Sequence, residues 1–273
     1  MYKTFARLAC IAPLVIACGN AWCSATTGAV VTDFQLQLVD LDPNDGITPW
    51  ILFDPTYGTS SAQSDVYQAQ PYNEFPVYTT GTGPLAPVSA SSAFNGASGL
   101  ASLVGDTFGA GAVVTTSATT SDGSGLGISE GTIGFFNDVQ IHTFELSPNT
   151  RLVISGNAMF TASMANGQAG DYADSGLLLE VFDDNDVSKE TILVLGGGVS
   201  PSSDPSFSLA TSFEVDYDNT SSQVVQAEVS GYLASYATTS DVTAVPEPGS
   251  ATLMLAGLAG LGACRRRRGP ARA

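Results

Sequence analysis

The sequence predicts an all-β protein whose antiparallel strands form a sandwich of two sheets. Apolar and polar residues alternate with a period of two over residues 152–164, 207–217 and 225–233. This period buries one face of a strand and leaves the other face in water, as in antiparallel sheets. No comparable helical period occurs between the two ends of the chain, and Gly, Asn and Asp turns separate the apolar runs. Strands joined by such turns favour a two-sheet sandwich, and a jelly-roll-like arrangement fits the same pattern.

Shorter strands are expected elsewhere along the chain. The candidates, in order, are 34–41, 49–53, 111–120, 131–146, 177–182 and 191–195. Residues 54–110 are rich in Gly, Ser, Ala, Thr and Pro, so we expect long loops and short edge strands there. Tyr217 lies on the apolar face of its strand and is expected in the core. Tyr232 and Tyr236 lie on the wet face of the last strand.

The N-terminal residues have the pattern of a secretory signal peptide. Lys3 and Arg7 form a positive segment, an apolar stretch over 8–18 follows, and we predict cleavage after Ala25. The alternative is lipidation at Cys18, which follows Val-Ile-Ala in a loose lipobox. A lipid anchor would duplicate the anchor predicted at the other end of the chain.

The C-terminal residues 245–273 combine three parts in a fixed order. The motif Val245, Pro246, Glu247, Pro248 is followed by residues 249–264, which carry no charge, and then by Arg265, Arg266, Arg267, Arg268. A helix over 249–264 would cover about 24 Å of a hydrocarbon core about 30 Å thick, so the arginines must snorkel or the bilayer must thin. The arginines stop the span and orient the C-terminus toward the cytoplasm. The two prolines keep the residues before them extended and accessible.

This tail resembles the PEP-CTERM sorting domain of exopolysaccharide-producing Gram-negative bacteria. The resemblance covers about residues 245–268, with all three parts present in order. It implies exosortase, a membrane-embedded, sortase-like cysteine enzyme, as the partner. It also implies export through the inner membrane, transient anchoring through the helix, cleavage near the motif, and a final place on the cell surface or in the extracellular matrix. An ordinary membrane anchor is the alternative interpretation.

The predicted body, residues 26–244, is strongly acidic and has no cysteine. Of the 26 acidic residues only Glu247 lies outside it, and of the nine basic residues only Arg151 and Lys189 lie inside it, which gives a net charge of −23. Such a surface repels nucleic acid and anionic lipid headgroups and favours cation binding. The body contains no disulfide, and it is long enough to bury the core of one domain or two.

An acidic cluster between two expected strands is a candidate Ca²⁺ site. Asp183, Asp184 and Asp186 offer the carboxylate oxygens that Ca²⁺ prefers, and Asp216 or Asp218 would complete the coordination. The alternative is a solvated hairpin tip, because Asn and Asp adopt turn geometry easily.

A second acidic segment, Asp40 to Gly46, also spaces its oxygen ligands two residues apart. Counted from Asp40, it lacks the Gly at the sixth position and the Glu at the twelfth position that an EF-hand needs. We interpret it as a polar hairpin turn.

The body has no recognisable catalytic constellation. His142 is the only histidine, no Gly-x-Ser-x-Gly elbow is present, and the absence of body cysteines argues against zinc catalysis. Asp174 begins one Asp-Ser-Gly triplet, but an aspartic protease needs two carboxylates that share a proton, and no second triplet occurs. Nothing selects a carboxylate pair for glycosidase chemistry. We therefore predict no catalytic residue and no enzymatic activity.

Three functions are compatible with these observations. The first is a structural or adhesive protein of the cell surface or the biofilm matrix, without a cofactor. The second is a carbohydrate-binding β-sandwich, with or without Ca²⁺, that uses Tyr232 and Tyr236 as a small stacking patch for an extracellular polysaccharide. Trp50 is the sole tryptophan of the body. The third function is a secreted hydrolase.

Overall fold

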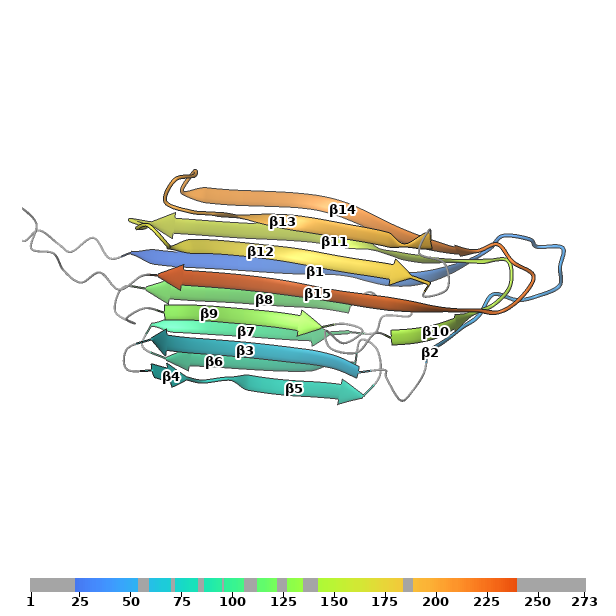
Figure 1. Ribbon diagram of the computed structural model, residues 1–273, viewed down its shortest axis with the longest axis horizontal. Helices are drawn as coiled ribbons and strands as arrows, with labels where there is room; N and C mark the ends of the chain where they lie inside the picture. Colours follow the sequence, from blue (N-terminus) through green and yellow to red (C-terminus); the bar gives the residue numbers. More distant parts are fainter. Residues whose placement is uncertain are drawn as a thin grey trace, which may run out of the picture.

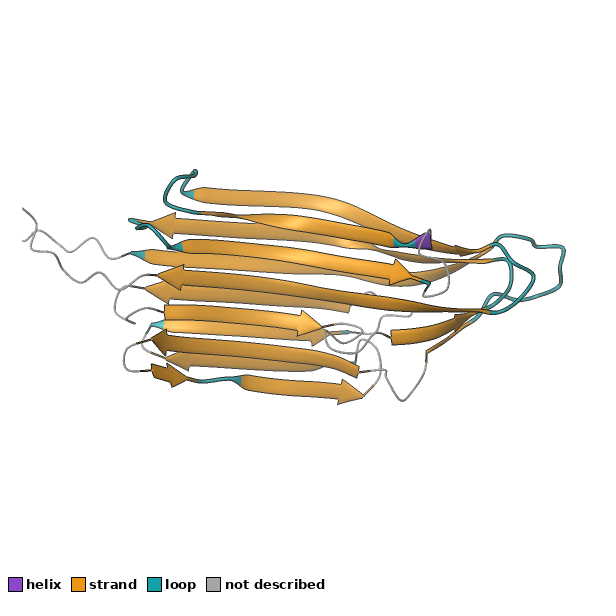
Figure 2. Ribbon diagram, in the orientation of Figure 1, coloured by secondary structure: helices purple, strands orange, loops and turns teal. Residues whose placement is uncertain are grey.

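The described residues form two antiparallel β-sheets packed face to face (Figures 1 and 2). The computed structural model describes residues 23–53, 59–69, 72–82, 86–94, 96–105, 112–121, 127–134, 142–183 and 189–239. The strands run along the long axis of an elongated molecule. The prediction of an all-β, two-sheet sandwich is confirmed.

Each sheet mixes strands from distant parts of the chain. Sheet A contains, in order, β14 (Ser206–Asn219), β11 (Thr150–Ala165), β1 (Ser24–Asp40), β8 (Ala112–Ser121), β7 (Ala97–Val104) and β6 (Val88–Phe94). Sheet B contains, in order, β13 (Thr191–Val199), β12 (Tyr172–Phe182), β15 (Val225–Thr239), β9 (Gly127–Gly134), β3 (Thr59–Ala69) and β4 (Tyr72–Glu74). In addition, β5 (Val77–Thr82) pairs with β3, and β10 (His142–Leu146) pairs with both β15 and β2 (Ile51–Phe53).

The main hydrophobic core lies between the sheets and is built from the strands with the clearest alternation. On β11 the side chains of Leu152, Ile154 and Phe160 are almost fully buried. Tyr217 of β14 is 2 % exposed, as predicted, and its ring meets Phe144 edge-on with centroids 6.1 Å apart. The period-two pattern therefore identified the inner faces of β11, β14 and β15.

The single strand expected over 131–146 is two strands. β9 pairs with the C-terminal half of β15, from Tyr232 to Thr239, whereas β10 pairs with its N-terminal part, from Val225 to Val229. Both run antiparallel to β15, so the long β15 supports two separate partners on one edge. Residues 135–141, which join them in sequence, lie outside the described residues.

The strand expected over 34–41 is the end of a longer strand. β1 begins at Ser24, and Ala25 is fully buried between Met164 and Thr120. The thiol of Cys23 is also buried and donates a hydrogen bond to Asp171 Oδ2 at 3.0 Å. Cleavage after Ala25, as predicted, would remove the first two residues of this strand.

The expectation of long loops over 54–110 is wrong for the described part of that segment, which contains β3 to β7. The short edge strands expected there are present as β4, β5 and β6. The strands of this segment bury small residues. Ser64 of β3 and Ser92 of β6 are buried, and their hydroxyls lie 2.7 Å apart. A Cβ on Gly99 would collide with the backbone carbonyl of Glu130 in the opposite sheet. The two sheets approach too closely here for large side chains, so the segment has the composition of a loop although it forms strands.

Candidate functional site

The outer face of sheet B carries a row of acidic and tyrosine side chains. Glu130 of β9 pairs on one side with Asp65 of β3 and on the other side with Tyr236 of β15. Tyr236 in turn pairs with Asp174 of β12. The residues on either side of Asp174 and of Tyr236 in sequence are buried, so the row itself points away from the core.

Two residues further along β15, β12 and β13, the next row on the same face carries only glycine and alanine. Ala234 pairs with Gly176, and Gly176 pairs with Gly196 of β13. One row further, Tyr232 and Val194 again present large exposed side chains. The result is a groove of about 300 Å³ across three strands, lined by Asp174, Ser175, Gly176, Val194, Leu195, Gly196, Gly197, Tyr232, Ala234 and Tyr236.

The carboxylates of this face have no cationic partner among the residues that line the groove. Burial raises the pKa of Asp174, and its Oδ1 accepts no hydrogen bond from the described residues. Burial, followed by the negative charges of Glu74 and Glu130, raises the pKa of Asp65. Each carboxylate is therefore held in a place that penalises its charged form.

Two tyrosine hydroxyls of this face, those of Tyr236 and Tyr172, stay protonated at neutral pH. Burial and then the charge of Glu130 raise the pKa of Tyr236 to about 12. Burial, Asp174 and Glu130 likewise raise the pKa of Tyr172, which stands two residues before Asp174 on β12. Glu130 is itself held by a hydrogen bond of 2.6 Å from the Thr132 hydroxyl. The groove thus combines the rings and hydroxyls of Tyr232 and Tyr236 with the carboxylate of Asp174.

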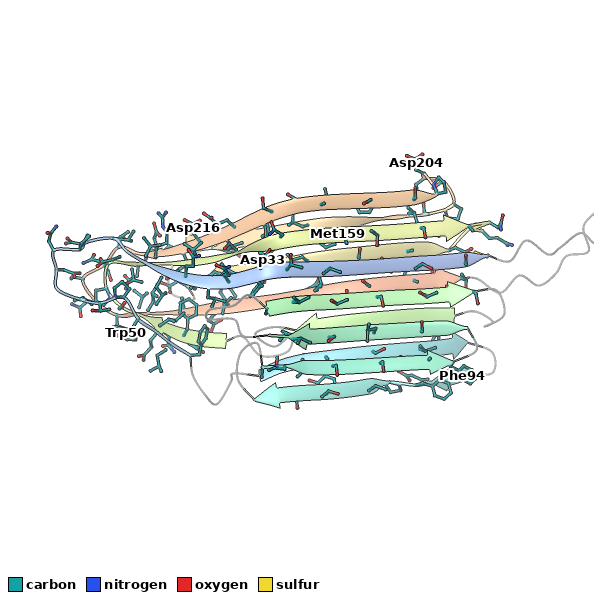
Figure 3. The ribbon with its side chains drawn as sticks, turned by 180° about the vertical axis from the view of Figure 1, so that it is seen from behind. Asp33, Trp50, Phe94, Met159, Asp204 and Asp216 are labelled. Carbon is teal, nitrogen blue, oxygen red and sulfur yellow. The ribbon has the colours of Figure 1, made fainter. Side chains whose placement is uncertain are left out.

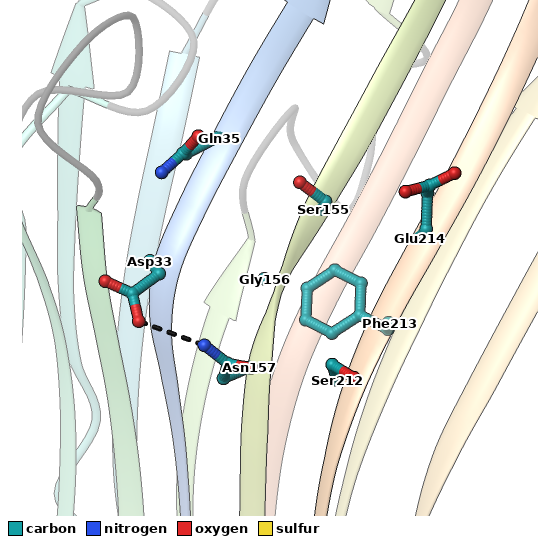
Figure 4. A pocket seen from close by; sticks show the side chains of 8 residues that line it. All are labelled: Asp33, Gln35, Ser155, Gly156, Asn157, Ser212, Phe213 and Glu214. Atoms are coloured by element: carbon teal, nitrogen blue, oxygen red, sulfur yellow. Dashed lines mark hydrogen bonds between the residues drawn. The ribbon is translucent and has the colours of Figure 1, made fainter.

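A second, polar pocket lies on the outer face of sheet A (Figure 4). It forms where β1 has a bulge between Thr32 and Gln35, and Asp33 adopts a left-handed conformation with φ of 53°. Asn157 donates a hydrogen bond of 3.0 Å to Asp33, and Glu214 stands on the far side of the pocket. The volume is about 420 Å³, but its one aromatic residue, Phe213, is buried in the core. This pocket offers hydrogen bonds without a stacking surface.

The C-terminal residues match one protein-family model. Residues 244–268 fit the PEP-CTERM protein-sorting motif. The chain carries a PEP-CTERM sorting motif. It is therefore an exported protein that exosortase sorts and that is transiently anchored in the membrane. Neither the curated proteins nor the solved structures gave a significant match to this chain.

The sorting motif follows directly from the β-sandwich. β15 ends at Thr239, close to the start of β1, because Ala25 and Ala237 pack in the same small cluster of the core. Figure 1 shows β1 beginning and β15 ending at one end of the molecule. The motif residues Val245 to Pro248, the expected helix over 249–264 and the arginines Arg265 to Arg268 lie outside the described residues. Within the described ranges, no helix is sufficiently long and apolar for a membrane span.

Of the candidate Ca²⁺ ligands, the described residues include Asp183, Asp216 and Asp218. Asp183 is buried and accepts a hydrogen bond of 3.3 Å from the Tyr217 hydroxyl. Asp218 is bound by Arg151 through both carboxylate oxygens, and Asp216 lies 3.6 Å from the same guanidinium. No group of three metal-ligating acidic, histidine or cysteine side chains occurs among the described residues. Asp184 and Asp186 lie outside them.

The segment from Asp40 to Gly46 is a polar turn, although it does not join two strands of a hairpin. Backbone amides two residues on donate to the carboxylates of Asp40, Asp42 and Asp45. Asp45 Oδ2 also accepts from the Asn149 side chain at 2.8 Å. These carboxylates therefore stabilise the loops at the end of the molecule where Trp50 lies (Figure 3).

The sequence correctly placed Tyr232 and Tyr236 on one outer face, but it missed the groove between them. Asp174, which was considered only as part of a protease triplet, lines this groove. The signal that would have revealed it is the run of Gly residues in β13, because small residues in adjacent strands leave a hollow between larger ones. His142 pairs through its backbone with Val229 at the other end of β15.

Proposed function

We propose that this protein is a non-enzymatic protein of the cell surface or extracellular matrix of a Gram-negative, exopolysaccharide-producing bacterium, in which it has a structural or adhesive role. The sorting motif over residues 244–268 carries this proposal. After export through the inner membrane, the helix over 249–264 would hold the chain while exosortase reaches the prolines. Cleavage near the motif would then transfer the sandwich to the surface or the biofilm matrix.

The shape and the charge of the body, residues 26–244, fit a protein of the cell surface or the extracellular matrix. Its sheets form an elongated sandwich (Figure 1), and its net charge of −23 keeps it soluble and away from anionic headgroups. Before processing, the tail would leave the sandwich at the end opposite the loops around Trp50 (Figure 3). Those loops would therefore be directed away from the membrane.

The test is to alter the tail and follow the size and location of the protein in cell fractions. Deletion of Val245 to Ala273 should abolish processing and change release. Substitution of Pro246, Glu247 and Pro248 by alanine should leave an anchored, unprocessed chain, because the helix and the arginines remain. Thr243→Ala, just before the matched residues, is the matched control and should be processed normally. Unchanged size and location of both altered chains would refute the sorting route.

A second candidate function is carbohydrate binding, which the groove between Tyr232 and Tyr236 favours. Aromatic rings beside carboxylates suit a sugar, since the rings cover its apolar face and the carboxylates accept from its hydroxyls. A glycan array with and without Ca²⁺ separates this function from a purely structural role. A blank array would favour the structural role, and binding that needs Ca²⁺ would favour the Ca²⁺-dependent form.

Calcium binding and hydrolysis have their own tests. Isothermal titration of the purified protein with Ca²⁺ should give heat and a rise in melting temperature if the loop with Asp183, Asp184 and Asp186 binds the ion. Absence of both would exclude a Ca²⁺ role. A secreted hydrolase would require polysaccharide turnover that is lost in a carboxylate-to-amide variant.

A further inference from the structure

The groove on the outer face of sheet B has the form of a site for one class of polysaccharide. We propose that it binds a glycan with free amino groups, with the sugar held between Tyr232 and Tyr236 and an ammonium group on Asp174. This inference rests on the carbohydrate-binding function proposed above and names its ligand class. It goes beyond the sorting motif, which concerns only the tail.

The shape of the groove favours a sugar chain. Its floor is the row Ala234, Gly176 and Gly196, which carries nothing larger than a methyl group. Tyr232 and Tyr236 stand on either side of this floor, four residues apart on β15, which is about 13 Å along a strand at about 3.3 Å per residue. β13 is the edge strand of sheet B, so the groove is open at this edge of the sheet. A sugar polymer is therefore able to extend beyond β13.

The backbone around Gly196 and Gly176 leaves little room for a larger residue at either position. A Cβ on Gly196 would collide with the backbone carbonyl of Ser175, and Gly196 has a φ of 137° that other residues rarely adopt. A Cβ on Gly176 would lie 3.3 Å from the backbone carbonyl of Leu195, a tight contact. The hollow is therefore a property of the backbone of β12 and β13, and no side chain movement is needed to open it.

The charge of the groove selects the kind of sugar. Asp174 lines it directly, and Glu130 and Asp65 continue the same row of the sheet. Arg151 and Lys189, the cations of the described residues, belong to sheet A and to the residues before β13, and neither lines the groove. An anionic polysaccharide would be repelled, whereas an ammonium group would gain a charge-assisted hydrogen bond to the Asp174 carboxylate that lines the groove.

A basic peptide shares the positive charge but fits the groove less well. The floor offers no deep apolar pocket for side chains, and the walls offer the rings of Tyr232 and Tyr236. Rings of this kind stack on the flat apolar face of a sugar while their hydroxyls bond to it. The peptide is therefore the alternative that the experiment must exclude.

The experiment measures binding of the purified full chain in detergent micelles by isothermal titration. The probes are a hexamer of β-1,4-linked glucosamine, the same hexamer fully N-acetylated, an oligouronate, and oligolysine of equal charge. We expect the amino hexamer to bind at least about tenfold more tightly than the acetylated one, because only a free amino group carries the positive charge that forms a charge-assisted hydrogen bond to Asp174. The oligouronate should not bind, and oligolysine should bind more weakly than the amino hexamer.

Variants then localise the binding. Tyr232→Ala and Asp174→Asn should each weaken binding of the amino hexamer about tenfold, and the salt dependence of binding should fall in Asp174→Asn. The matched controls, which should bind normally, are Tyr78→Ala on β5, where Tyr78 is 57 % exposed, and Asp42→Asn in the turn after β1. Circular dichroism confirms that each variant is folded.

The outcomes separate the two proposals. Equal binding of the amino and acetylated hexamers, lost in Tyr232→Ala, would overturn the amino-sugar inference and leave carbohydrate binding intact. If neither Tyr232→Ala nor Asp174→Asn weakens binding of the amino hexamer, the glycan binds elsewhere and the groove is not the binding site. Oligolysine that binds as tightly as the amino hexamer would show that the groove recognises positive charge and not a sugar, which would overturn the inference. Absence of binding to every glycan would overturn this inference together with carbohydrate binding, while the sorting route would stand on its own test.

Discussion

At the scale of single residues, Asn219 is the buried polar group that ties the loops together at the end of the sandwich near Trp50. Its side-chain amide donates to the carbonyls of Ser147 and Gln223 at 2.9 and 2.8 Å. Its carbonyl accepts from the backbone and the hydroxyl of Ser221. One fully buried side chain thus satisfies backbone groups from three loop residues.

We predict that Asn219→Leu lowers the free energy of unfolding by about 2–4 kcal/mol, because buried carbonyls lose their donors. Urea unfolding followed by circular dichroism measures this loss. Asn44→Leu, in the exposed turn after β1, is the control and should change stability little. A loss of the same size in both variants would show that Asn219 has no special role.

Two aspartates show opposite effects of folding on a carboxyl group. Burial raises the pKa of Asp174 above its ordinary value of 3.8, so its charge destabilises the folded state at neutral pH. The hydrogen bonds from Arg151 lower the pKa of Asp218 below 3.8, so its charge stabilises the folded state above that pH. Since both groups are partly exposed, solvent screens part of each effect.

We therefore predict that Asp174→Asn raises the melting temperature at pH 7 and that Asp218→Asn lowers it. The gain in Asp174→Asn should shrink as the pH falls through the raised pKa of Asp174, and it should vanish below pH 3.8. The deficit in Asp218→Asn should persist at pH 3.8 and shrink only below it, as the pH falls through the lowered pKa. Melting curves of both variants from pH 3 to 7 test these two predictions. A melting temperature that Asp174→Asn lowers at pH 7 would contradict the prediction for Asp174. A gain in stability in Asp174→Asn would fit the proposed binding role of Asp174, because functional sites commonly cost stability.

At the scale of elements, the two sheets of the sandwich pack against each other in two different ways. β11, β14 and the first half of β15 bury large side chains, and their sheets are separated by a hydrophobic layer. Around β3, β6, β7 and β9 the sheets meet through Ser, Ala and Gly, and the hydroxyls of Ser64 on β3 and Ser92 on β6 bridge them at 2.7 Å. The close approach leaves the backbone of one sheet almost against the other.

Two glycines make this close approach possible. A Cβ on Gly99 would collide with the carbonyl of Glu130, and a Cβ on Gly131 would collide with that of Leu100. We predict that Gly99→Ala or Gly131→Ala lowers the free energy of unfolding by about 3 kcal/mol or more, because the obstruction is backbone that cannot rotate away. The control is Gly28→Ala in β1, where the nearest atom is 3.5 Å from the new Cβ. Thermal unfolding that is equal in all three variants would disprove the close approach.

The elements also show why part of the fold could be predicted and part could not. The alternation in β11 and β14 was readable because Leu, Ile and Phe differ sharply from Ser and Asp. In β6 the inner positions are Val88, Ala90 and Ser92, and the outer ones are Ser and Ala, so burial leaves almost no contrast in hydrophobicity. The groove could not be predicted from the sequence either. Gly176 and Gly196 form its floor only because β12 and β13 pair in the observed register.

At the scale of the whole molecule, the charge of the body opposes its compact state. The net charge of −23 over residues 26–244 produces mutual repulsion, which salt screens with a Debye length of about 8 Å at 0.15 M. We predict that the melting temperature rises between 10 and 300 mM NaCl. An unchanged or lower melting temperature at high salt would mean that local ion pairs such as Arg151 with Asp218 outweigh the overall repulsion. CaCl₂ at matched ionic strength separates general screening from specific Ca²⁺ binding.

The sequence by itself determined that this protein is exported and sorted, and it determined the fold class and the net charge of the body. The sorting motif is a short linear signal over residues 244–268, and period-two alternation and charge are also local properties of the chain. Only the tertiary structure decided which residues act together on that surface. Asp174, Val194 and Tyr232 are far apart in the chain, and they form one groove because β12 pairs with both β13 and β15. The pairing register of strands depends on contacts between distant segments, and it fixed both the floor of the groove and the acidic row beside it.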